Sequence, residues 1–141
     1  MSVPFYRCGF KEVKPQPQLK ITKVFDGNVD SFNNLGSYTV AEAGMHIISL
    51  EVCRAYQPLN SGNSVTVTAN IYKGSSAIGT HTDKVTSNGS NYCKVALAHV
   101  TVAVNCNKGE VIYLNKNSCT NPSGGYASDS ACACIYRVEV S

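Results

Sequence analysis

Charged residues are scarce in this sequence, at 15% of 141 residues, while 43% are hydrophobic. This balance argues against an intrinsically disordered chain and against a bundle of charged helices. No apolar run approaches the roughly 20 residues that a helix needs to cross a bilayer, so we expect no membrane insertion. A basic segment followed by an apolar one is absent from the first residues, so no secretory signal peptide is expected there.

Motifs of the common enzyme and nucleic-acid-binding classes are also missing. The sequence has no G-x-S-x-G, H-E-x-x-H, P-loop or dinucleotide-binding pattern, which argues against an enzyme and against a bound cofactor. The twelve Lys and Arg give a net charge of only +3 and are scattered singly. A nucleic-acid-binding protein usually clusters its basic residues, so nucleic acid is not an expected partner.

The sequence is rich in Val, Thr, Tyr, Ser, Asn and Gly, which are typical of strands and turns, so it predicts an all-β protein. The clearest alternation lies in residues 64–72, where Val65, Val67, Ala69 and Ile71 share one face. Turns are expected at 26–28 and 73–76, and 107–109 is expected to form a hairpin that pairs 110–114 with the preceding strand. The other expected strands are 19–25, 38–40, 46–52, 77–81, 92–106 and 131–140.

The length fits a single domain. Residues 1–18 are interpreted as an N-terminal arm, which includes a candidate first edge strand at 4–10, because Pro15 and Pro17 resist both helix and sheet pairing. Residues 19–141 then form the folded domain.

Seven cysteines leave at least one thiol without a partner in the same chain, and no C-x-x-C pair suggests zinc. We favour reduced, structural cysteines, with a disulfide framework as the alternative. Cys132 and Cys134 fall on the same face of the last strand, where they are badly placed to bond each other, so packing is the preferred interpretation.

The three histidines, His46, His81 and His99, lie far apart in sequence and show no zinc-ligand spacing. His46 is the one to watch, because a buried histidine makes stability depend on pH between about 5 and 8. Asp26, Asp30 and Asp129 are candidate calcium ligands, but they form no D-x-D-x-D-G loop.

Three polar loops are expected at 57–64, 82–91 and 115–130, rich in residues that suit recognition on a rigid β scaffold. The alternative is that they are only solvated connections. Asn88 also begins an N-x-S sequon, which matters only in a secreted protein. The candidate recognition residues are Asn60, Asn63, Asn88, Asn91, Asn121, Tyr126 and Asp129.

Two motifs carry a family resemblance. Gly36-x-Tyr38 followed by Gly44-x-His46 and Ile48-Ser49, and later Gly109-Glu110-Val111-Ile112-Tyr113-Leu114, resemble the corresponding segments of the C1q/TNF-like jelly-roll family. The chain departs from the family at residues 41–43, which replace a proline-containing corner, and at His46, which replaces a tyrosine. The glycine of the family's last strand has no counterpart.

The resemblance implies a jelly-roll sandwich of about ten antiparallel strands that assembles as a compact homotrimer, and a binding or structural function rather than catalysis. Candidates for the core or the trimer contacts are Tyr38, His46, Ile48, Tyr113 and Tyr136.

Two settings fit such a protein. The first, which we favour, is a virion or phage surface component, namely a capsid decoration protein, a fibre head or a receptor-binding head. In it, residues 1–18 dock on a capsid or tail protein. The alternative is a secreted C1q-like lectin or ligand that recognises glycans or protein receptors.

Overall fold

The computed structural model describes residues 16–89, 92–120, 122 and 124–140. Nine strands and no helix are found in this part of the chain, so none of it forms a helix that is long and apolar enough to span a membrane. The strands are β1 (Leu19–Val29), β2 (Ser37–Thr39), β3 (Gly44–Leu59), β4 (Ser64–Lys73), β5 (Ser76–Thr86), β6 (Tyr92–Cys106), β7 (Val111–Tyr113), β8 (Ser118–Thr120) and β9 (Tyr126–Val140).

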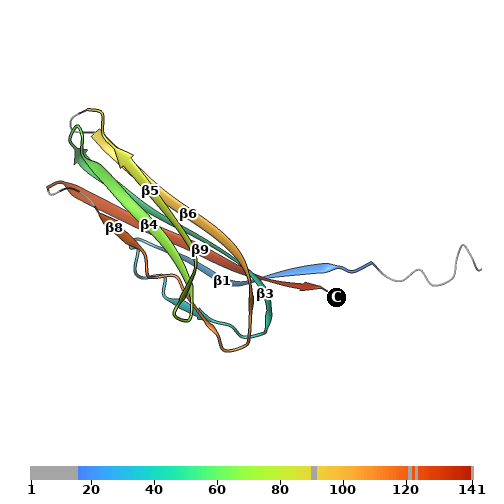
Figure 1. Cartoon of the computed structure of the whole chain (residues 1–141). Coiled ribbons are helices and arrows are strands. Elements are labelled where there is room, and N and C mark those ends of the chain that lie inside the picture. Colours follow the sequence, from blue (N-terminus) through green and yellow to red (C-terminus); the bar gives the residue numbers. More distant parts are fainter. Residues whose placement is uncertain (1–15, 90–91, 121, 123, 141) are drawn as a thin grey trace, which may run out of the picture.

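The strands form two antiparallel sheets (Figure 1). The first sheet has the order β1-β9-β3-β6, and the second has the order β2-β7-β4-β5, with β8 paired to β4. All connections except β4–β5 and β7–β8 cross between the sheets, which is the connectivity of a jelly-roll sandwich. The all-β jelly-roll fold expected from the sequence is therefore confirmed, with nine strands in the described residues where about ten were expected.

The core lies between the sheets and follows from the alternation of side chains along each strand. Ile48, Leu50 and Val52 of β3 are fully buried on one side, and Val65 and Val67 of β4 meet them from the other side. The face expected for 64–72 is confirmed, since all four of its apolar residues have no exposed surface. The strand 92–106 is found with the expected bounds.

One expected turn and one expected hairpin are wrong. Residues 26–28 do not form a turn but continue β1, which pairs with β9 through a bulge between Lys23 and Phe25. Gly27 serves packing instead, because a Cβ there would lie 3.0 Å from a methyl carbon of Leu35. The turn at 107–109 does not close a hairpin, because β7 pairs with β2 and β4 in the second sheet and not with β6.

Several strands are longer than the sequence indicated, because pairing with a neighbouring strand carries them into polar residues. β5 continues to Thr86 along β4, so the loop expected at 82–91 begins only at residue 87. β9 begins at Tyr126 opposite Gln57, and β8 interrupts the loop expected at 115–130.

Asn117, next to β8, ties three segments of the chain together. Its Nδ2 donates to the carbonyls of Phe32 and Leu114 at 3.1 and 2.8 Å, and its Oδ1 accepts from the backbone N–H of Asn70 at 2.8 Å. The side chain is buried, so water cannot replace these bonds without opening the structure.

We expect Asn117→Asp to lower the free energy of unfolding by about 2–3 kcal/mol, because a carboxylate cannot donate to the two carbonyls. Urea denaturation measures the change. Asn28→Asp, at an exposed position of β1, is the matched control and should shift stability by less than about 0.5 kcal/mol. Equal effects of the two substitutions would contradict the role of Asn117.

Candidate functional site

Three connections meet at one end of the sandwich, which we call the loop end and define as residues 60–63, 87–89, 122 and 124–126. β3 ends and β4 begins there, and β5 ends and β6 begins there as well. β9 begins at the same end, since Tyr126 pairs with Gln57 near the end of β3. Residue 16 and the C-terminal end of β9 lie at the far end of the molecule (Figure 1).

Hydrogen bonds hold the loop end in place. The N–H of Gly62 donates to the carbonyl of Ser87 at 2.9 Å, and the N–H of Ser87 donates to the carbonyl of Asn63 at 3.0 Å. The buried Tyr56 hydroxyl donates to the carbonyl of Pro122 at 2.7 Å. A Cβ on Gly125 would lie 2.9 Å from the carbonyl oxygen of Gln57, so only glycine permits this close approach. The loops are therefore anchored to the strands.

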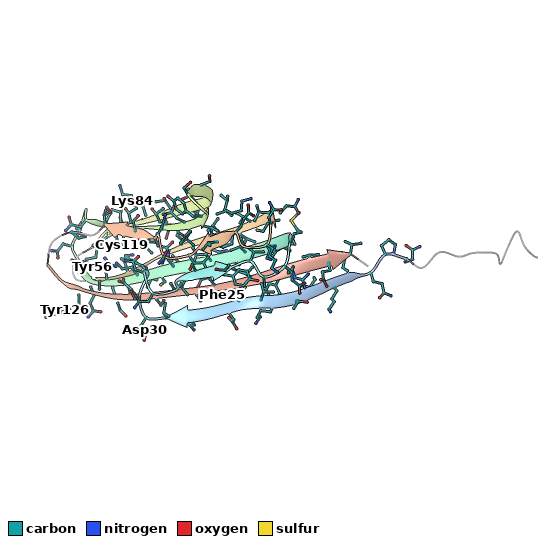
Figure 2. All side chains as sticks on the ribbon, turned by 90° about the horizontal axis from the view of Figure 1, so that it is seen from below. Phe25, Asp30, Tyr56, Lys84, Cys119 and Tyr126 are labelled. Atoms are coloured by element: carbon teal, nitrogen blue, oxygen red, sulfur yellow. The ribbon has the colours of Figure 1, made fainter. Side chains whose placement is uncertain are left out.

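The loop end gathers four of the predicted recognition residues. Asn60 and Asn88 are exposed, Asn63 is half-buried, and Tyr126 is 81% exposed at the tip of the molecule (Figure 2). Asn91 and Asn121 lie outside the described residues. The sequence placed these positions in three separate loops, and only the order of the strands brings them to one end.

Asp129 does not belong to this set. It lies within β9, where both of its carboxylate oxygens accept hydrogen bonds from Arg54, at 2.6 Å from Nε and 2.7 Å from Nη2. The guanidinium also lies 5.1 Å from the centroid of the Phe32 ring. Hydrogen bonding to Asp129 raises the pKa of Arg54. The predicted loop residue is thus half of an ion pair between adjacent strands.

The three aspartates considered as calcium ligands do not gather in one group among the described residues. Asp26 lies on the outward face of the first sheet beside Lys23, and Asp129 pairs with Arg54. Among the described residues, no three His, Cys, Asp or Glu side chains form a group that fits a metal ion.

We expect Asp129→Asn to lower the free energy of unfolding by about 2 kcal/mol, because a paired charge loses its partner in a partly buried place. Thermal and urea unfolding measure the effect. If Asp129 were instead a calcium ligand, added calcium would raise the melting temperature of the original chain and not that of the variant.

The outward face of the first sheet is unusually apolar. Among the described residues all seven exposed large hydrophobic side chains lie on it, as their registers show: Leu19, Ile21, Met45, Val95, Leu97, Tyr126 and Val140. By register, Leu19, Ile21, Met45 and Val140 lie at one end of this face and Val95, Leu97 and Tyr126 at the other. Exposed apolar side chains that gather on one face often mark an interaction surface.

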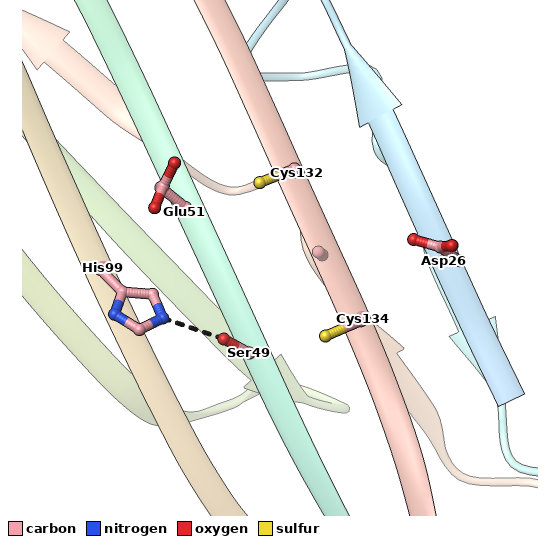
Figure 3. Close-up of a pocket in the computed structure, with 7 residues that line it drawn as sticks. Asp26, Ser49, Glu51, His99, Cys132 and Cys134 are labelled. Carbon is pink, nitrogen blue, oxygen red and sulfur yellow. Dashed lines mark hydrogen bonds between the residues drawn. The ribbon is translucent and has the colours of Figure 1, made fainter. Parts of the chain in front are cut away.

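A hollow of about 180 Å³ lies on this face, lined by both polar and apolar groups (Figure 3). Ser49 Oγ and His99 Nε2 lie 2.9 Å apart in it, and the Thr101 hydroxyl donates to Ser49 at 3.2 Å. Glu51 and the thiols of Cys132 and Cys134 also line the hollow.

The sequence analysis missed the Ser49–His99 pair, because the two residues are 50 positions apart and only the β3–β6 register joins them. A serine–histidine pair resembles the nucleophile and base of a hydrolase. Such a site also needs a group that orients the second histidine nitrogen and donors for an oxyanion. No described residue hydrogen-bonds to His99 Nδ1. The pair therefore gives no support to catalysis.

His46 is fully buried on the inner face of β3. Its Nδ1 donates to the carbonyl of Gly44 at 2.9 Å, and its Nε2 has no partner among the described residues. Arg137 lies opposite His46 on β9, and the Tyr38 ring lies 6.3 Å away between centroids. The acid sensitivity expected for His46 stays a prediction.

The other core or trimer candidates fall in three places. Ile48 is in the core, and Tyr38 packs against it. Tyr136 lies on the outward face of the first sheet, with Lys23 Nζ 5.8 Å from its ring centroid. Tyr113 lies on the second sheet, with Lys116 Nζ 5.1 Å from its ring centroid.

The six described cysteines are unpaired thiols. Cys106 is buried in the core and Cys119 packs against it, as expected for small apolar residues. Cys132 and Cys134 share one face as expected, on the outward side of the first sheet, where Cys132 is exposed. Glu51 and Ser49 lie opposite them on β3, so neither faces another cysteine there.

We expect iodoacetamide at roughly pH 7 to label Cys93, which is exposed, before the other described thiols. Burial raises the pKa of Cys53, Cys106, Cys119 and Cys132, which lowers their thiolate fraction. Peptide mapping by mass spectrometry measures the rates, with denatured protein as control. Native labelling of Cys106 as fast as Cys93 would contradict the structure.

Comparison with models of known protein families finds no match for this chain. Comparison with curated proteins finds no match either. Among solved structures, the chain is similar to the structure of Eiger TNF from S. frugiperda, with a TM-score of 0.41 and 10% identity, over 77% of this chain and 68% of that chain. We rest the jelly-roll assignment on the strand order and registers given above.

Proposed function

We propose that this protein is a non-enzymatic binding module that assembles as a homotrimer through the outward face of the first sheet and presents the loop end to a ligand. The observation that carries the proposal is that all seven exposed large hydrophobic side chains of the described residues lie on that one face. Covering six of them, all except Tyr126 at the rim of the face, would remove apolar surface from water, which stabilises an assembly.

The outward faces of the two sheets differ in polarity, as an assembly through the first sheet requires. The outward face of the second sheet is polar: Thr66 pairs across the strands with Thr120, and Thr68 lies beside Thr82 with their hydroxyls 2.9 Å apart. A copy that covers its first sheet therefore leaves a polar surface toward water. The number of three copies comes from the resemblance of the two sequence motifs to the C1q/TNF-like family.

The positions of the loop end and of residue 16 at opposite ends of the molecule support a role as a surface component of a virion or phage. The loop end lies at one extreme and residue 16 at the other (Figure 1). An arm that docks on a capsid or tail protein would thus leave the loop end facing outward, toward a host receptor or another ligand. Deletion of residues 1–18 should abolish attachment to the particle in this setting, and leave ligand binding intact in a secreted lectin.

We expect native mass spectrometry, with and without reductant, to give three times 15.1 kDa, about 45 kDa, for the intact chain. Ile21→Asp and Val95→Asp, at opposite ends of the apolar face, should each give a monomer, because a buried unpaired carboxylate costs several kcal/mol. Thr86→Asp, exposed on the second sheet, is the matched control and should stay trimeric.

Circular dichroism checks that each variant remains folded. A monomeric intact chain, or a trimer that survives both aspartate substitutions, would overturn the proposed assembly. Loss of the trimer in Thr86→Asp alone would place the contact on the second sheet instead.

A further inference from the structure

The loop end carries three side-chain amides without a hydrogen-bond partner in the part of the chain that the structure describes. They are the side-chain amides of Asn60, Asn63 and Asn88. The backbone N–H of Asn63 donates to the carbonyl of Asn60, and the carbonyl of Asn63 accepts from Ser87. By contrast, the amides of Asn70 and Asn117 in the second sheet are bonded to neighbouring segments. Unused amides on an anchored surface can donate and accept at once, which suits a ligand with many hydroxyls.

Tyr126 adds a flat apolar surface beside one more free amide. It pairs in register with Gln57, and the two residues line a hollow of about 250 Å³ together with Ala55, Cys93, Ala127 and Ser128. The Tyr126 ring makes no hydrogen bond or ring contact with the described residues, and most of its surface is in water. An exposed aromatic ring with an amide and a hydroxyl nearby offers both apolar and polar contacts to one ligand.

The lack of charged side chains in the segments of the loop end argues against several classes of ligand. Residues 57–64, 86–93 and 117–128 contain no Lys, Arg, Asp or Glu. The nearest charged groups in β3 and β9, Arg54 and Asp129, neutralise each other through two hydrogen bonds. Lys94, which follows Cys93 in β6, is half-buried opposite Tyr56 on the inner side of the sheet. Phosphate, sulfate and carboxylate ligands are usually held by Arg or Lys, and cationic ligands by carboxylates. The loop end offers neither kind of group in these segments.

We infer that the loop end binds an uncharged saccharide. One sugar ring stacks its C–H face on Tyr126, and its hydroxyls bond to Gln57 and Ser128. Further sugars of an oligosaccharide reach toward Asn60, Asn63 and Asn88. This inference rests on the proposed function and names its ligand class.

The position of Tyr126 allows this site in the proposed trimer. The residue faces outward from the first sheet, but it stands in the last row before the loops, at the tip of the molecule (Figure 2). It therefore lies at the rim of the face that another copy covers, where a small ligand has access from the loop end.

Saturation-transfer NMR on the full chain tests the inference. The probes are the methyl glycosides of α-mannose, β-galactose and N-acetylglucosamine, with 3′-sialyllactose as the acidic probe. We expect saturation of at least one neutral sugar, unchanged when salt is raised, because no ion pair contributes. Tyr126→Ala should weaken binding by roughly tenfold, whereas Tyr126→Phe keeps the ring and most of the affinity. Tyr72→Ala, on the second sheet, is the matched control and should bind normally.

Three results would overturn the inference. One is the absence of saturation transfer to every neutral probe. Another is an equal loss of binding in Tyr126→Ala and Tyr72→Ala, which would place the sugar elsewhere. The third is salt-dependent binding of the acidic probe alone that Tyr126→Ala abolishes. That result would refute the ligand class and still support a binding function of the loop end. Assembly is judged separately by the native mass.

Discussion

Side chains along a β-strand point alternately to opposite faces. In the first sheet this alternation places apolar residues on both the inner and the outer face. Its inner positions, such as Ile48 and Leu50, are buried by the second sheet. Its outer positions include Met45 and Leu97, which are exposed in the single chain. A sandwich of two sheets can cover only one face of each, so an apolar outer face is left over. The self-association proposed above would cover this exposed apolar face.

The antiparallel order of the strands also decides which connections lie at each end of the molecule. Each crossover between the sheets returns the chain to one of two ends, and the connections β3–β4, β5–β6 and β8–β9 all fall at the loop end. The backbone bonds between Gly62, Asn63 and Ser87 fix two of these loops to each other. The backbone of such anchored loops loses little freedom when a ligand binds, which favours recognition.

Strand positions with clear alternation were predictable, as β4 and β6 show, because burial of one face leaves a local pattern in the sequence. Turns were less predictable. Asp26-Gly27-Asn28 has the composition of a turn, yet it continues β1, because pairing with β9 and the approach of Leu35 outweigh the local preference. Residues 107–109 do turn, but the sequence gives no sign that the next strand belongs to the other sheet.

The sequence by itself determined the all-β class, the face that each regular strand buries and the polar character of the loops, because these depend on neighbours within a few residues. Only the tertiary structure decided which distant residues meet. Arg54 and Asp129, or Ser49 and His99, come together through strand registers across 75 and 50 positions. Register depends on the pairing of whole strands after long loops have closed, and no local pattern encodes that pairing.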